Sequence, residues 1–176
     1  MIDPLIIAYI AIIALLLVCS AFFSMSETAF TSASQVRLKK MSKDGDKRAE
    51  KALYILGNYD KFLTTILIGN NLVNIAATSI ATIAFAMLLG EATGSLASTV
   101  VMTLVVLTFG EITPKTLAKR RPERIVLRIV GIVNAIEIIF SPLSWMFGKL
   151  TGYIGRKTGG EDSSTITEDE LEVMID

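Results

Sequence analysis

Residues 4–23 read PLIIAYIAIIALLLVCSAFF and contain no charged side chain. A helix of about 20 apolar residues is long enough to cross the hydrocarbon core of a bilayer. A cleaved signal peptide would need a basic start and a shorter apolar core, whereas Asp3 precedes this run. We therefore expect a retained membrane-spanning helix at the start of the chain.

Two further segments have the composition of membrane spans. Residues 62–89, FLTTILIGNNLVNIAATSIATIAFAMLL, are uncharged but polar in the middle, and residues 96–109 begin another apolar run. The last run must continue through Glu111 to reach membrane length. The sequence, 52% hydrophobic over 176 residues, therefore predicts an all-α membrane protein with three transmembrane helices.

Basic side chains predict how these spans are oriented. Residues 37–51 hold seven lysines and arginines, residues 90–95 hold none, and six more follow the third span: Lys115, Lys119, Arg120, Arg121, Arg124 and Arg128. Basic loops stay in the cytoplasm, so we expect the N-terminus outside and the C-terminus inside a plasma (cytoplasmic) membrane. Nucleic-acid binding is the alternative, but clusters beside spans favour anionic lipids as partners.

The segments between and after the spans suggest interfacial helices. Residues 35–56 mix apolar and charged positions and are interrupted near Gly45, as in an interfacial helix or helical hairpin. Residues 123–153 are apolar again, with Pro142 breaking them. A fourth span there would place later basic residues outside, so we expect broken juxtamembrane helices at the cytoplasmic face.

The tail differs in composition from the rest. We assign residues 1–156 to a transmembrane domain with juxtamembrane helices, and residues 157–176 to a linker and the start of a cytosolic helix. Thr167 and Glu170 have the spacing of a capping box that opens such a helix. We interpret the chain as a fragment that a soluble regulatory domain normally follows.

The composition also narrows the possible chemistry. The chain has no histidine and one cysteine, Cys19, which excludes an intrachain disulfide and a zinc site built from several cysteines. It shows no convincing nucleophile–base arrangement and no phosphate-binding glycine-rich loop. We therefore do not expect an enzyme.

Polar side chains inside the first span form a stripe. At 3.6 residues per turn, four of them share one helix face: Ser20, Ser24, Glu27 and Thr31. Ser26 points elsewhere. Costly polar groups within a membrane indicate a functional site, although serines that bond back to their own backbone are the alternative.

The second span carries GNNLVN at residues 69–74. Asn70 and Asn74 are four residues apart and can share a face, and Gly69 allows another helix to approach closely. We select Asn70 as the candidate ligand because it lies near the centre of the span. Interhelical hydrogen bonding is the alternative role.

The third span ends in TFGEITPKT, residues 108–116. Pro114 lacks an amide hydrogen and clashes with the carbonyl four residues earlier, so it should leave the Gly110 carbonyl without its helical donor. Glu111 places a carboxylate beside that carbonyl. The alternative is a simple kink in which Glu111 pairs with Lys115.

These candidate groups are all hard oxygen donors: hydroxyls, an amide oxygen, a backbone carbonyl and carboxylates. Such ligands suit Mg²⁺, Ca²⁺ or Na⁺ and do not suit zinc or copper. Carbonyls freed in broken helices are a recurrent way for transporters to hold cations near the midplane.

Three motifs in this order, AFFSMSETAFTS, IGNNLVN and LTFGEITPKTLAKR, resemble the CNNM/CorB/CorC family of magnesium transporters. The resemblance covers roughly residues 3–156. It implies a homodimer of three-span protomers, and Mg²⁺ ligands at the matching positions Ser20, Ser24, Asn70, Gly110 and Glu111. Glu27, nearer the cytoplasmic end, is a lesser candidate that would bind Na⁺ or a proton. Asn74 and Thr31 are further lesser candidates for the ion pathway.

The resemblance also implies what the protein does. We expect Mg²⁺ transport by alternating access, in the export direction and coupled to Na⁺, with ATP acting only through a cytosolic pair of CBS modules that this chain lacks. Two alternatives stay open: a Mg²⁺ sensor without flux of its own, and a membrane scaffold whose polar residues only join helices.

Overall fold

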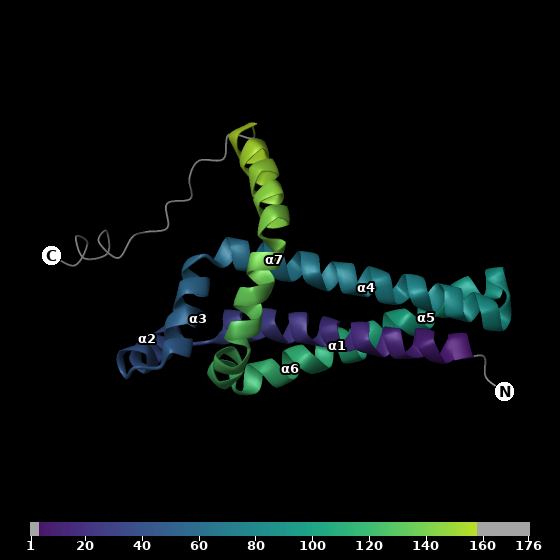
Figure 1. Cartoon of the computed structure of the whole chain (residues 1–176), viewed down its shortest axis with the longest axis horizontal. Coiled ribbons are helices and arrows are strands. Elements are labelled where there is room, and N and C mark those ends of the chain that lie inside the picture. Colours follow the sequence, from purple (N-terminus) through teal and green to yellow (C-terminus); the bar gives the residue numbers. More distant parts are fainter. Residues whose placement is uncertain (1–3, 158–176) are drawn as a thin grey trace. The chain divides into compact units, whose positions relative to one another are not determined.

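The structure, a computed structural model, describes residues 4–157, and the regular elements within this range are all helices (Figure 1). Four segments are long and apolar enough to cross a membrane: Pro4–Ser32, Tyr59–Leu89, Glu91–Arg120 and Pro122–Leu143. The all-α membrane fold is thus confirmed. The prediction of three such segments is corrected to four, because the apolar run after Pro122 also reaches membrane length.

Helix α1 (Pro4–Ser32) packs along helix α4 (Tyr59–Leu89) (Figure 1). Gly69 allows their close approach, because a Cβ atom there would lie 2.5 Å from the Phe23 ring. Farther along, the Phe30 and Phe62 ring centroids are 4.7 Å apart. The expectation that Gly69 admits a neighbouring helix is therefore confirmed.

Helix α5 (Glu91–Val105) returns along α4 after a one-residue turn. Gly90 makes this turn at φ 82°, a conformation that favours glycine. A Cβ atom on Gly94 would lie 2.6 Å from the Ala86 backbone, and the Thr82 and Ser98 hydroxyls are 3.1 Å apart. Small and hydroxylated residues thus hold the two helices close together.

The third span does not break at Pro114. A π-helical stretch, η1 (Val106–Ile112), leads directly into helix α6 (Thr113–Arg120), with Pro114 in the first turn of α6. The Thr113 amide donates to the Thr108 carbonyl, five residues back. Wider turns before the proline accommodate the missing amide and keep the run helical.

The basic segment after α1 forms a helical hairpin, one of the two forms predicted for it. Helix α2 (Gln35–Lys43) and helix α3 (Lys47–Gly57) are joined at Gly45, whose φ is 94°. The Ser34 hydroxyl caps α2 by accepting the Arg37 amide, and the Asp46 carboxylate caps α3 by accepting the Arg48 amide.

Helix α7 (Pro122–Lys157) continues through Pro142, so the prediction of broken helices there is wrong. The chain divides into two compact units at this proline, Met1–Ser141 and Pro142–Asp176. Within the first unit, Val126, Val130 and Val133 are buried in the same core as Phe30 and Phe62. The predicted capping box at Thr167 and Glu170 lies outside the described residues.

Candidate cation site

Ser20 and Asn70 meet in the packing between α1 and α4. The Ser20 hydroxyl donates to the Asn70 amide oxygen at 3.1 Å, and Ser20 is only 1% exposed. The hydroxyl therefore does not bond back to the backbone of its own helix. The structure thus brings together one predicted ligand from the first span and one from the second.

Gly110 lies at the same place, on η1. A Cβ atom at this position would be 2.8 Å from the Ser20 hydroxyl oxygen and 3.4 Å from the Ser20 Cβ. The absence of a side chain therefore allows the η1 backbone to approach Ser20. Three predicted ligand positions on three separate segments converge here.

Ser24 follows Ser20 by one helical turn. It is fully buried, and its hydroxyl oxygen has no hydrogen-bond partner among the described residues. Ser26, equally buried, instead donates to the Phe22 carbonyl at 2.7 Å. Back-bonding to the helix, the alternative role considered for the serines, thus describes Ser26 and describes neither Ser20 nor Ser24.

The carboxylates near this site have different surroundings. Glu111 is half-buried and makes no hydrogen bond or ion pair with any described residue. Lys115 contacts Glu27 instead, with 3.1 Å between its ammonium nitrogen and the carboxylate oxygen. The alternative of a Glu111–Lys115 pair is therefore not what the structure contains. The ion pair joins α1 to α6 and leaves Glu111 unpaired in the described region.

The two lesser candidates on α1 and α4 also differ from each other. The Thr31 hydroxyl donates to the Glu27 carbonyl at 2.8 Å and lies 3.0 Å from the Tyr59 hydroxyl. It thus has protein partners already. The Asn74 amide oxygen is buried without a partner, one turn beyond Asn70. Asn74 on α4 thus provides a second unpartnered oxygen, in addition to that of Ser24 on α1.

This arrangement has the chemistry of a small, hard cation site. The candidate ligands are hydroxyl, amide, backbone and carboxylate oxygens, which Mg²⁺, Ca²⁺ and Na⁺ prefer, and the structure brings the Ser20 hydroxyl and the Asn70 amide oxygen together. Within residues 4–157, no group of three or more His, Cys, Asp or Glu side chains could hold a metal ion. Neutral oxygens would therefore supply most of the coordination, and Glu111 most of the charge.

Sequence reasoning missed Glu137 in α7. It is 4% exposed, and one of its carboxylate oxygens has no partner in the described residues. Lys61, at the start of α4, acts on the Glu137 carboxylate electrostatically. The sequence did contain a sign of this burial: Glu137 lies four and seven residues after Val133 and Val130, so all three share one face of the helix.

Residues 11–176 match the family model of the Cyclin M transmembrane N-terminal domain, CNNM. The chain belongs to this family. The resemblance noted from the three motifs is therefore confirmed, and the chain is a multi-pass membrane domain.

CNNM relatives with curated names include bacterial proteins. The chain is 35% identical to the UPF0053 inner membrane protein YfjD of Escherichia coli K12 over 160 residues, which cover 89% of this chain and 37% of that protein. It is 41% identical to a UPF0053 protein of Haemophilus influenzae over 167 residues, covering 93% of this chain and 40% of the relative.

Another E. coli K12 relative is named polyamine export protein. It is 28% identical over 181 residues, which cover 95% of this chain and 40% of the relative. The chain thus spans at most about two fifths of the length of these three relatives.

Proposed function

We propose that the chain is the membrane domain of a Mg²⁺ transporter that works by alternating access. The observation that carries this proposal is the convergence of Ser20, Asn70 and Gly110 from α1, α4 and η1. Ser24 and Asn74, one helical turn from Ser20 and Asn70 respectively, each carry a further oxygen without a partner in the described residues. Unsatisfied buried oxygens cost free energy, and a bound cation would recover it.

Several finer features belong to this proposal. Transport runs in the export direction and is coupled to Na⁺, and the protein works as a homodimer with its N-terminus outside. Glu27 is a candidate for Na⁺ or a proton once its ion pair with Lys115 opens. Slow carrier behaviour fits Mg²⁺, which gives up its water reluctantly to a site of protein oxygens.

Polyamine export is a second candidate, favoured by the name of one E. coli relative. A polyamine carries amino groups along a chain and calls for several spaced carboxylates. The candidate site has a single unpaired carboxylate in the described residues, Glu111, which follows Gly110 directly in the sequence. This geometry favours a single small ion.

Flux measurements test the proposal. Full-length protein is reconstituted into liposomes that contain a Mg²⁺-sensitive dye, with and without a Na⁺ gradient and with spermidine as a competitor. We expect Mg²⁺ flux that falls at least about tenfold in Glu111→Gln, since an interaction with a charged ligand is worth about 1.5–3 kcal/mol. Glu91→Gln, on the exposed first turn of α5, is the matched control and should retain flux.

Three outcomes would contradict the proposal in different ways. Tight Mg²⁺ binding without flux would support a sensor. Spermidine flux in place of Mg²⁺ flux would support polyamine export. Equal Mg²⁺ flux in Glu111→Gln and Glu91→Gln would place the transport path elsewhere.

A further inference from the structure

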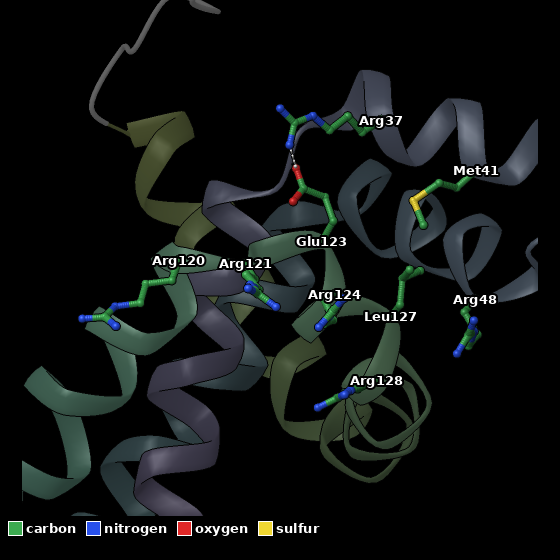
Figure 2. Close-up of a pocket in the computed structure, with 9 residues that line it drawn as sticks. All are labelled: Arg37, Met41, Arg48, Arg120, Arg121, Glu123, Arg124, Leu127 and Arg128. Carbon is green, nitrogen blue, oxygen red and sulfur yellow. Dashed lines mark hydrogen bonds and ion pairs between the residues drawn. The ribbon is translucent and has the colours of Figure 1, made fainter.

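A pocket of about 470 Å³ opens among helices α2, α3, α6 and α7, within the first compact unit (Figure 2). We call it the arginine pocket. Its lining consists of six arginines, one glutamate and two apolar side chains: Arg37, Arg48, Arg120, Arg121, Arg124, Arg128, Glu123, Met41 and Leu127.

Among the residues that the structure describes, acidic side chains neutralise two of these arginines. Arg37 pairs with Glu123 at 3.4 Å, and Arg48 pairs with Asp46 at 2.9 Å. The hydrogen bond from the Arg48 side chain lowers the pKa of Asp46. The other four make no hydrogen bond or ion pair with a described residue: Arg120, Arg121, Arg124 and Arg128. The pocket therefore keeps a large uncompensated positive charge.

Three of these guanidinium groups face a common space. Figure 2 shows Arg121, Arg124 and Arg128 directing their ends toward one region beside α7, whereas Arg120 points away from it. Like charges so close repel each other unless an anion lies between them. Planar guanidinium groups bind phosphate oxygens in pairs, so a phosphate group matches this arrangement.

The exposed face of α7 continues from the pocket as an apolar surface. Arg124, Arg128, Ile132 and Ile139 lie on one stripe of the helix, at spacings of four, four and seven residues. Ile132 is 56% and Ile139 is 71% exposed, while the opposite side of α7 is buried in the core. A free phosphate ion would use only the arginines. A phospholipid would use both the arginines and the isoleucines.

We propose that the arginine pocket binds the phosphate of an anionic phospholipid whose acyl chains lie along Ile132 and Ile139. The position fits this ligand, because the pocket lies where apolar helices end and basic side chains begin, at the level of lipid headgroups. The proposal is independent of which ion the membrane domain carries.

Native mass spectrometry of the purified chain in neutral detergent tests the site. The chain is titrated with phosphatidylglycerol or with phosphatidylcholine, and the affinity for each is compared. Arg124→Gln/Arg128→Gln should bind phosphatidylglycerol about 30-fold more weakly, because each basic side chain near an anionic lipid contributes about fivefold in affinity and two are removed. Phosphatidylcholine binding should change little.

The matched control removes the same charge outside the pocket. Lys39→Gln/Lys40→Gln on exposed positions of α2 should keep the affinity for phosphatidylglycerol. An equal loss of phosphatidylglycerol affinity in both double variants would mean that the lipid is attracted by the overall positive charge, and this would overturn the proposed site. Displacement of the lipid by an excess of inorganic phosphate would identify free phosphate as the ligand and overturn the lipid assignment.

If circular dichroism shows that the glutamine variant does not fold, a charge-conserving variant tests the site instead. Arg124→Lys/Arg128→Lys keeps both charges and removes the paired guanidinium contacts. We expect a several-fold loss of phosphatidylglycerol affinity. Unchanged affinity would show that geometry is irrelevant and would also overturn the proposal.

Discussion

A buried hydroxyl that lacks a partner costs about 1–3 kcal/mol of folding free energy. The Ser24 oxygen is in this state, and so is the Asn74 amide oxygen on the neighbouring helix. Alanine would fill the space of Ser24 without leaving an unpaired hydroxyl, so packing alone does not explain the serine. Their presence beside the Ser20–Asn70 contact is the residue-scale basis for a ligand site.

Replacing Ser24 by alanine tests this interpretation. We expect Ser24→Ala to melt at the same or a higher temperature without Mg²⁺, because an unsatisfied polar group is removed. Its Mg²⁺ affinity should fall about tenfold, as for one lost contact to a charged ligand. Ser26→Ala, which removes a bond to the Phe22 carbonyl, should keep the affinity. Equal affinities in the two variants would refute the assignment.

Gly110→Ala tests the close approach of η1 to α1. The added Cβ atom would lie 2.8 Å from the Ser20 oxygen, so we expect a loss of about 1–3 kcal/mol in stability and weaker Mg²⁺ binding. Gly131→Ala is the control, since its Cβ meets nothing within 4 Å. That variant should gain up to about 1 kcal/mol of helix stability. Thermal melting without Mg²⁺ measures the change in stability, and the added shift with Mg²⁺ measures the change in binding.

At the scale of elements, apolar length and charge were enough to predict the helices. Residues 4–23 and 62–89 lie within α1 and α4, and the interruption near Gly45 is the turn between α2 and α3. The effect of a proline was harder to predict. Pro114 follows a stretch of wider π-helical turns that absorbs its missing hydrogen bond, and Pro142 lies inside α7.

Pro114→Ala tests whether the proline maintains the π-helical stretch. Restoring an amide at this position should favour ordinary α-helical register through Gly110 and weaken Mg²⁺ binding, although no side-chain ligand is lost. Pro122→Ala is the control, because the first residue of α7 has no helical acceptor for its amide. Mg²⁺ titration followed by melting measures both. Unchanged affinity in Pro114→Ala would count against a role for the η1 backbone.

At the scale of the whole molecule, the structure brings together Ser20, Asn70 and Gly110 from the predicted set, whereas the ion pairs were not predicted. Helical spacing placed Ser20 and Ser24 on one stripe, and the structure brings Ser20 to Asn70 and Gly110. The Lys115–Glu27 ion pair joins segments distant in sequence, so local spacing favoured the wrong partner for Lys115. Glu137 was missed although its spacing from Val130 and Val133 places it on the same face of α7.

The central claim is that a Mg²⁺ site lies where α1, α4 and η1 meet, and the Mg²⁺ dependence of thermal unfolding tests it most directly. A ligand that binds only the folded state stabilises it by about 2.7 kcal/mol at a hundred times its dissociation constant. We expect the purified wild-type chain to melt at a higher temperature with Mg²⁺, Asn70→Ala to lose most of this shift, and Asn71→Ala, at the exposed neighbouring position, to retain it. The absence of a shift in the wild type, or an equal shift in both variants, would contradict the site.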